Sequence, residues 1–373
     1  MTHLSPLRAL SVASISVMTC LTGVGLSGAL AGPLKSSTAP IVTHQRCAEN
    51  RAAGPMTFVS PFLYDASAGI IDVVDAKALG YFSQLCIAVN IEVPSYSLSP
   101  YELVGAGKGT ITGEGSAADA LMETANGANL VAIATMADAS DYALLTRPSI
   151  TRLPQLAGKL LAYHTVFPVV LSEMLKRSGA NLSLIHEVND TSYDPTVLFA
   201  RSPGFSALQA YQSNEPLTLE AAGYRQGTAF REWTPGQFGV KGTFNVQVVN
   251  GTFLKKHRST VADFLRAELH ALDFCLAHES TCVTMEQKVA TSAGFPGSLT
   301  HSLAEWRLEA TLIRNHRLAK TGIGVETAAE WRPEAKAVVA YRLIAHAPPL
   351  SRVEDTTLAA SLYRGTSLVW PGP

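Results

Sequence analysis

The chain has 373 residues, of which 47% are apolar and 16% are charged, and its formal net charge is −1. This length leaves room for two domains with a substantial buried core, and the composition excludes a disordered tail and a polytopic membrane protein. Because 29 Lys and Arg residues are balanced by 30 Asp and Glu residues, the chain lacks the basic field that holds nucleic acid, and we expect no such partner.

Residues 1–31 have the pattern of a secretory signal peptide. Arg8 gives a positive start, an uncharged stretch rich in Leu, Val, Ala and Gly follows, and Ala29-Leu30-Ala31 supplies small residues for a signal peptidase. We predict cleavage before Gly32 and export to the periplasm or the outer face of the cytoplasmic membrane. A lipid anchor at Cys20 is the alternative. A retained membrane span is disfavoured because the stretch is only weakly hydrophobic.

Export changes the interpretation of the cysteines. Four remain after the leader, Cys47, Cys86, Cys275 and Cys282, and an oxidising compartment permits three pairings among them. Cys275 and Cys282 are close in sequence and could join a helix end to the following turn. Buried free thiols are the alternative, which Cys86 fits best because it lies in an apolar run. The Cys and His spacing matches no zinc pattern, so we expect no metal and no cofactor.

After a loose lead-in over residues 32–55, strands and helices alternate. Short apolar runs bounded by turn residues predict buried strands, and apolar residues at helical spacing predict helices. The predicted strands are 56–60, 85–93, 110–113, 129–136, 160–163, 182–188, 205–211 and 243–249. The predicted helices are 66–79, 117–125, 167–177, 195–201, 216–222, 252–257, 259–277 and 299–313. Residues 321–373 show no clear pattern and are expected to form a strap over the outside.

Two early strands end in corners that could contact a ligand, because open α/β sheets bind ligands at the carboxyl ends of their strands. The aromatic residues Phe62 and Tyr64 follow the first strand, and Gly115 and Ser116 follow the third. Ser116 is a good helix N-cap, and the free amides behind it could hold a carboxylate, sulfonate, phosphate or ring edge. The alternative is that Ser116 only caps its own helix. Met136 ends the fourth strand at the same edge.

The stretch 205–223 is a strand, a polar corner and a helix. Pro216 fixes its own φ and suits the first position of a helix, while Glu215 before it is expected to be extended. Tyr211 and Asn214 therefore lie at the carboxyl end of the strand. Glu215 either caps this helix or contacts a ligand.

Four short segments resemble one family. They are Tyr211-x-x-Asn214-Glu215-Pro216, Ala76-Lys77-Ala78-Leu79-Gly80-Tyr81-Phe82, Gly115-Ser116-Ala117 and the Leu153 to Lys159 segment. Together with the order of elements, they resemble the ABC-transporter substrate-binding proteins of the nitrate/sulfonate/taurine and thiamine-pyrimidine-precursor group. One departure is Ser206 before Ala207, where the family commonly has Asp, which puts a close substrate match in doubt.

The resemblance implies an α/β fold of the type II periplasmic-binding-protein scaffold, in which two lobes, each a mixed sheet flanked by helices, are joined by two crossing segments. Lobe 1 would comprise 56–145 and 246–320, and lobe 2 would comprise 146–245, with 141–146 as the first crossing. Thr165 would then cap the 167–177 helix and offer its amides to the ligand. His164 is either a structural residue or a second contact. Trp233 lies in an aromatic loop before the return crossing, and core packing is the alternative for it and for Tyr64.

The resemblance implies a small-molecule solute trapped between the lobes and delivered to the permease and ATPase of an ABC importer, by a protein expected to be a monomer and not an enzyme. The residues expected to bind it are Phe62, Tyr64, Gly115, Ser116, Met136, Thr165, Tyr211, Asn214, Glu215 and Trp233. Aromatic corners suit a flat body, and Glu215 favours N–H donors over a simple anion, so we expect a heteroaromatic, pyrimidine-like solute. The alternatives are a sulfonate, nitrate or taurine-type anion, a solute sensor, or an enzyme. The enzyme is disfavoured because Gly-x-Ser-x-Gly, His-Glu-x-x-His and clustered cysteines are missing from the sequence.

Overall fold

A computed structural model describes residues 39–93, 99–113, 115–316 and 321–372. The predicted signal peptide, its cleavage site before Gly32 and the alternative anchor at Cys20 lie outside these residues. None of the helices within them is long and apolar enough to cross a membrane. The strands form two five-stranded sheets and one two-stranded hairpin.

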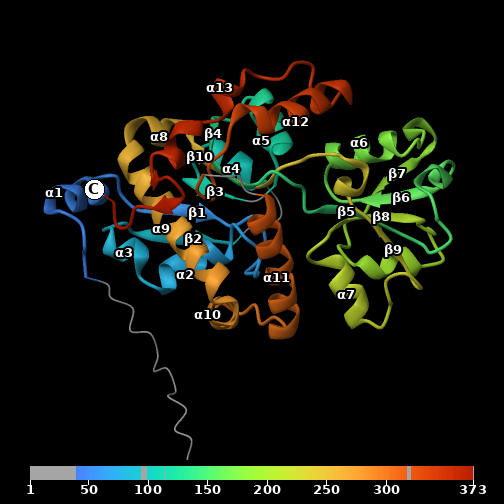
Figure 1. Cartoon of the computed structure of the whole chain (residues 1–373), viewed down its shortest axis with the longest axis horizontal. Helices are drawn as coiled ribbons and strands as arrows, with labels where there is room; N and C mark the ends of the chain where they lie inside the picture. Colours follow the sequence, from blue (N-terminus) through green and yellow to red (C-terminus); the bar gives the residue numbers. More distant parts are fainter. Residues whose placement is uncertain (1–38, 94–98, 114, 317–320, 373) are drawn as a thin grey trace, which may run out of the picture. The chain divides into compact units, whose positions relative to one another are not determined.

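The first sheet has the strand order β2-β1-β3-β10-β4 (Figure 1). β1 is parallel to β2 and β3, whereas β10 is antiparallel to β3 and β4. Both faces are apolar: Phe58 packs into a core with α2 and α9, and Val59 into another with α5. The strands are β1 Met56–Val59, β2 Val89–Glu92, β3 Ile111–Thr112, β4 Leu130–Ala137 and β10 Phe244–Asn250, and the helices are α2 Ile71–Ala78, α5 Ala117–Ala125 and α9 Arg258–Ala277.

The second sheet has the strand order β7-β6-β8-β5-β9. β6 is parallel to β7 and β8, and β5 is antiparallel to β8 and β9. Leu144 and Leu161 pack on one face with α6, and Leu145 and Leu208 pack on the other with Leu219 of α7. The bounds are β5 Tyr142–Thr146, β6 Leu160–Tyr163, β7 His186–Asn189, β8 Ala207–Tyr211, β9 Arg231–Trp233, α6 Val169–Arg177 and α7 Glu215–Ala221.

We call the first sheet with its helices lobe 1 and the second sheet with its helices lobe 2. The chain passes from β4 to β5 and returns from β9 to β10, so two segments join the lobes. This confirms the predicted α/β fold with two mixed sheets flanked by helices. One detail was wrong: the predicted crossing 141–146 is mostly strand β5. Its residues alternate between the two cores of lobe 2 and pair with β8, which makes it a full member of that sheet.

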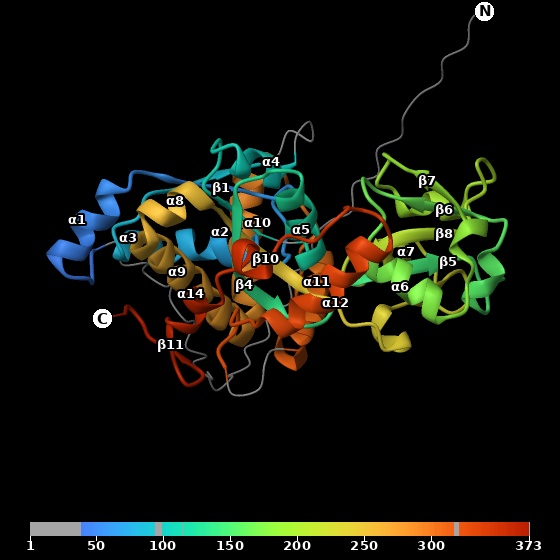
Figure 2. The ribbon, with the colours of Figure 1, turned by 90° about the horizontal axis from the view of Figure 1, so that it is seen from above.

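The segment after α9 is more helical than expected. It contains α10 Glu279–Ser292, α11 Leu299–His316, α12 Ala328–Ala340, α13 Leu350–Val353 and α14 Thr356–Ala360, followed by the hairpin of β11 Tyr363–Arg364 and β12 Ser367–Leu368. α12 packs against both α5 of lobe 1 and α6 of lobe 2 (Figure 2). The hydroxyl of Tyr341, just after α12, donates to Glu173 of α6 at 2.9 Å. Residues expected to form a featureless strap therefore connect the two lobes.

The region predicted as a loose lead-in, 32–55, contains a helix, α1 His44–Ala52. Thr43 caps it, and Cys47 on α1 forms a disulfide with Cys86, so the prediction of a free Cys86 thiol was wrong. Cys86 lies just after a short helix, α3 Tyr81–Gln84, at a Cα–Cα distance of 5.1 Å from Cys47. The second disulfide joins Cys275 to Cys282, one of the expected pairings.

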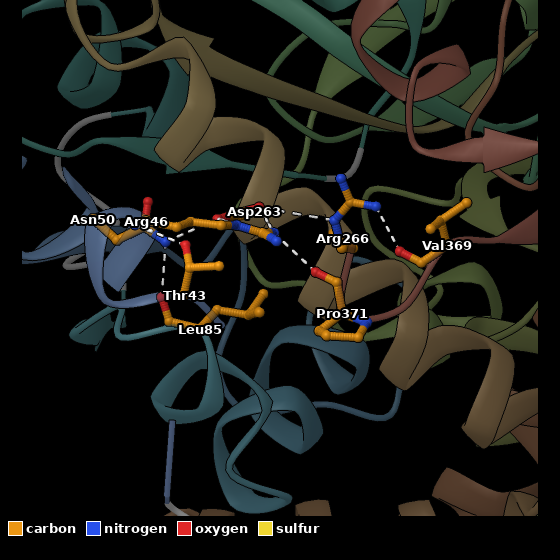
Figure 3. A network of polar contacts seen from close by, with 8 residues as sticks. All are labelled: Thr43, Arg46, Asn50, Leu85, Asp263, Arg266, Val369 and Pro371. Atoms are coloured by element: carbon orange, nitrogen blue, oxygen red, sulfur yellow. Dashed lines mark hydrogen bonds and ion pairs between the residues drawn. The ribbon is translucent and has the colours of Figure 1, made fainter. Parts of the chain in front are cut away.

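Polar contacts hold α1 against α9 and the last residues of the chain (Figure 3). The Arg46 guanidinium donates to both carboxylate oxygens of Asp263 and to the carbonyl of Pro371. Asn50 donates to the same carboxylate at 2.8 Å, and Arg266 lies 3.8 Å from it and donates to the carbonyl of Val369. We call Arg46, Asn50, Asp263 and Arg266 the clasp.

The remaining elements differ from the predictions in small ways. The predicted strand 182–188 is a 3-10 turn over Leu182–Leu184 followed by β7, and the predicted helix 195–201 is a 3-10 helix over Pro195–Phe199. Asn181 and Asp194 cap these turns with their side chains. The other helices are α4 Pro100–Gly105, α8 Gly251–Lys256 and 3-10 helices over Leu153–Leu156 and Pro235–Phe238.

Candidate functional site

Three aromatic rings meet where the β1 corner of lobe 1 approaches the β8 corner of lobe 2. The centroid of the Phe62 ring lies 6.2 Å from that of Tyr211 in an edge-to-face arrangement, and Tyr211 stacks on Tyr142 at 5.0 Å. Tyr142 begins β5 and Tyr211 ends β8, and the two are directly paired across the sheet. All three rings are half-buried. The structure therefore brings together two of the predicted residues, Phe62 and Tyr211, from different lobes.

The corner after β8 is stabilised by its own glutamate. The buried carboxylate of Glu215 accepts a hydrogen bond from the Tyr211 amide at 2.7 Å, and Pro216 follows within the first turn of α7. Burial raises the pKa of Glu215 to about 7, although the hydrogen bonds from backbone amides oppose this. Glu215 is the first residue of α7 rather than an extended residue before it, and it does not cap this helix as one of its predicted alternatives had it. Its carboxylate instead binds the end of β8, beside the aromatic group.

More carboxyl groups surround the same corner. Ser213 hydrogen-bonds to Asp141 of lobe 2 at 2.7 Å and to Glu309 of α11 at 3.0 Å. Burial raises the pKa of Asp141 to about 8, and burial and the charge of Asp141 raise that of Glu309 well above its usual value. Asp65, in the Phe62 corner, acts electrostatically on Glu215. Among the described residues, none of the ion pairs reaches these four carboxyls, so this is an acidic site.

α11 of lobe 1 contacts the β8 corner at two points. Glu309 accepts hydrogen bonds from the Ala68 amide at 2.6 Å and from the hydroxyls of Ser67 and Ser213. His301 Nε2 of α11 lies 3.1 Å from Oδ1 of Asn214. Asn214, a predicted ligand-binding residue, therefore lies at the site, but its side chain contacts α11. The sequence pattern of α11 predicted only a helix, and the roles of Glu309 and His301 were missed.

A buried polar cluster lies in lobe 1 at the carboxyl ends of β1 and β3. Asn245 and Gln247 are fully buried on β10 and hydrogen-bond to each other at 3.5 Å. A Cβ at position 113 would lie 2.3 Å from the Gln247 side chain, so only a glycine lets that side chain approach the backbone here. Within the described part of the chain, Ser60 Oγ and Gln247 Oε1 have no hydrogen-bond partner. Two polar residues in the otherwise apolar run 244–249 were the signal that could have revealed this cluster.

The start of α5 is filled by the chain's own groups. The amide and hydroxyl of Ser116 both donate to Asp119 at 2.8 Å, and the amide of Ala118 donates to Glu334 of α12 at 2.9 Å. Gly115 has a positive φ of 73°, and a Cβ there would meet the hydroxyl of Tyr101 at 2.3 Å. An internal carboxylate therefore occupies the amides predicted to bind an external anion, and the alternative of a structural cap describes Ser116.

Four other predicted residues lie apart from the aromatic group. Tyr64 packs against Phe295 with ring centroids 6.1 Å apart, and Met136 is fully buried in the lobe 1 core. The Trp233 indole donates to Thr146 at 2.9 Å and packs in lobe 2. Thr165 is exposed with a positive φ of 51°, and Pro168, not Thr165, precedes α6. His164 is buried, and its Nδ1 lies 2.7 Å from the Asp190 carbonyl. This contact fits the structural role that was one of the two alternatives for His164.

Comparisons with known proteins agree on the fold. Residues 68–281 match the family model described as NMT1/THI5 like. A putative periplasmic sulfonate-binding protein of an ABC transporter from Methylobacillus flagellatus is 14% identical, with a TM-score of 0.60 over 82% of this chain and 93% of the other. The alkanesulfonate-binding protein of Xanthomonas axonopodis, bound to MOPS, is 15% identical, with a TM-score of 0.57 over 82% and 96%.

The same fold also occurs in an enzyme. The desulfurization enzyme DSZB is 12% identical, with a TM-score of 0.53 over 82% of this chain and 98% of the other. No curated protein matches the sequence. At these identities the solved structures share the fold with this chain, and the family model extends over more than half of its length.

Proposed function

Since this chain belongs to the NMT1/THI5-like family and has the fold of periplasmic binding proteins, we propose that it is an exported solute-binding protein. It captures a small molecule between lobe 1 and lobe 2 and delivers it to the permease and ATPase of an ABC importer. The closed conformation of the two lobes is populated only because the solute contacts both lobes at once.

The ligand we propose is a flat heteroaromatic molecule with N–H donors, such as an aminopyrimidine. The observation that carries this proposal is the placement of Phe62, Tyr211 and Tyr142 beside carboxyl groups. Aromatic faces accept a flat ring, and carboxylates accept hydrogen bonds from ring N–H and amino groups. Glu215 and Asp141 are buried at this corner and are not part of an ion pair among the described residues.

The same groups argue against a sulfonate, nitrate or taurine-type anion. An anion needs donors, yet the amide of Ala68 already donates to Glu309 and the amide of Ala118 to Glu334. Two of the amide corners of lobe 1 are thus occupied by carboxylates of the chain itself. A second negative group beside Glu309 would be disfavoured by Coulomb repulsion in this buried setting.

The setting of this function is outside the cytoplasm. The two disulfides suit an oxidising compartment, and residues 1–31 would direct export to the periplasm or the outer membrane face, with a lipid anchor at Cys20 as the alternative. The protein would act as a monomer. A sensor that presents the same solute to a receptor uses the same site, and neighbouring permease and ATPase genes would favour transport.

An enzyme on this scaffold is the weaker candidate. The four cysteines in the described part of the chain are paired in disulfides, so none of them is a thiol nucleophile. Solute capture needs no covalent step, and the groups at the lobe junction are suited to binding.

The test is differential scanning fluorimetry of the exported protein with aminopyrimidines, taurine, an alkanesulfonate and nitrate. Binding to the folded state alone raises the unfolding temperature, so we expect a shift with an aminopyrimidine. A shift with the anions only would overturn the proposed ligand class. Calorimetry with the best ligand should then show an affinity loss in Tyr211→Ala, and the exposed Tyr193→Ala is the matched control.

A further inference from the structure

One row of side chains crosses from lobe 2 to lobe 1. Asp141 precedes β5, Ser213 lies in the corner between β8 and α7, and Glu309 lies in the middle of α11. The Ser213 hydroxyl is 2.7 Å from Oδ2 of Asp141 and 3.0 Å from Oε1 of Glu309. All three residues are buried. Because Glu309 also accepts from Ala68 at 2.6 Å, the row ends on the backbone of lobe 1.

The two hydrogen bonds of Ser213 set the smallest number of protons that the two acids can hold. A serine hydroxyl has one proton to donate, and an ionised carboxylate is an acceptor only. If Asp141 and Glu309 were both ionised, one of the two contacts of Ser213 would join two oxygens with no proton between them. If one carboxyl is protonated, it donates to the Ser213 oxygen, and the Ser213 hydroxyl donates to the other. The observed geometry therefore requires at least one proton on the two acids.

The surroundings favour the protonated pair. The other titratable groups at this junction are Glu215 on α7, Glu232 on β9 and Asp65 in the Phe62 corner, and Glu215 and Glu232 act on Asp141 in the direction that retains its proton. His301 of α11 is engaged with Asn214. Burial is the largest cause of the raised pKa of both acids, and for Asp141 the pKa reaches about 8.

We propose that Asp141, Ser213 and Glu309 form a one-proton latch between the lobes. With one proton present, the row is fully hydrogen-bonded and holds α11 against the β8 corner. When that proton is lost, two buried carboxylates lie on either side of one hydroxyl, and their repulsion separates α11 from the corner. The latch works in the ligand-free protein, so it goes beyond the proposed function and does not depend on it.

Hydrogen–deuterium exchange of the ligand-free protein tests the latch. Protection of segments 207–222 and 299–316 is measured at about pH 6 and about pH 9, on either side of the pKa of about 8 of Asp141, after correction for the intrinsic exchange rate. We expect both segments to lose protection at the higher pH, while β2 and α3 of lobe 1 keep theirs. Equal protection of 207–222 and 299–316 at the two pH values would overturn the proposal.

The variant Glu309→Gln removes the titration and keeps the contacts. Its amide oxygen can accept from Ala68 and its amide N–H can donate to Ser213, so both segments should stay protected at both pH values. If it fails to fold, Asp141→Asn replaces it with the same expectation. The control is Glu326→Gln, because Glu326 is a buried acid whose pKa is raised to about 8 but whose contacts with Thr135 and Trp331 lie within one part of the molecule. Loss of the pH response in the control, or its persistence in Glu309→Gln, would contradict the latch.

Discussion

The clasp and the lobe junction are both buried polar networks, but they balance charge in opposite ways. In the clasp, the carboxylate of Asp263 lies between the guanidinium groups of Arg46 and Arg266 (Figure 3). At the junction, Asp141 and Glu309 share the hydroxyl of Ser213, and no arginine or lysine among the described residues forms an ion pair with them. In the clasp two guanidinium groups therefore offset one carboxylate, whereas at the junction burial and the neighbouring acids raise the pKa of both Asp141 and Glu309. One network suits permanent attachment and the other suits a contact that opens.

The largest expected effect comes from breaking the charge balance of the clasp. Asp263→Ala leaves two largely buried guanidinium groups without their counter-charge, and we expect a loss of about 3–5 kcal/mol in the free energy of unfolding. Denaturation in urea measures it. Asp138→Ala is the control, because its partner Lys241 is exposed and a surface pair contributes about 0–1 kcal/mol. A loss from Asp263→Ala no greater than that of the control would show that the clasp stabilises little.

Removal of the disulfides should give the next largest effect. The Cys47–Cys86 disulfide spans 39 residues and the Cys275–Cys282 disulfide spans 7. From loop entropy alone, replacing both cysteines of a pair by serine should cost about 4 kcal/mol for the first and about 2 kcal/mol for the second. Urea denaturation under non-reducing conditions compares the two double variants. An equal or larger loss for the second pair would mean that packing, not loop closure, dominates.

The junction should make stability depend on pH. For Asp141 the folded pKa of about 8 lies above the unfolded value near 3.8, so between these values the folded state holds more protons than the unfolded one. Stability is therefore highest at the acidic end of this window and falls as pH rises to about 8. Glu215 and Glu326 act in the same direction. The unfolding temperature should drop by several degrees across this window, and a rise would contradict the raised pKa values.

Glu309→Gln should flatten part of that curve, and Asp263→Asn should not. The first variant removes a buried acid whose pKa is raised by burial and by the charge of Asp141, whereas the second removes an acid that lies between the guanidinium groups of Arg46 and Arg266. Melting curves of both variants over the same pH range compare the slopes. Equal slopes would remove the distinction between the clasp and the junction.

The sequence predicted the sheets better than it predicted the site. Apolar runs such as 130–137 and 207–211, which are short and bounded by turn residues, favour buried strands, and the corner at Pro216 follows from the fixed φ of proline. The crossing at 141–146 was wrong because a five-residue strand at a lobe boundary has no local signal that distinguishes it from a linker. The helix at 44–52 was missed because it buries only Cys47 and Asn50 and so has no apolar stripe, and the disulfide and Asp263 add to the stabilisation by its Thr43 cap.

The site depends on contacts between distant parts of the chain, and this limits what a sequence can show. Phe62 and Tyr211 were predicted because each ends a strand, and their meeting needed only the fold. Glu309 and Glu334 lie on helices whose apolar pattern gives no hint that a carboxylate would reach an amide of lobe 1. Trp233 and Met136 were assigned to the site from their positions near strand ends, yet their side chains point into packed cores.

The smallest effect concerns an uncharged contact between the lobes. A double-mutant cycle with Phe62→Leu and Tyr211→Leu should give a coupling of about 0.5–1.5 kcal/mol in the free energy of unfolding, because the rings meet edge to face at 6.2 Å. The coupling should be the same at about pH 6 and about pH 9 if the rings stay in contact. If it vanishes at the higher pH, release of the Glu309 latch also separates the rings, and the aromatic contact is a consequence of the proton rather than an independent link.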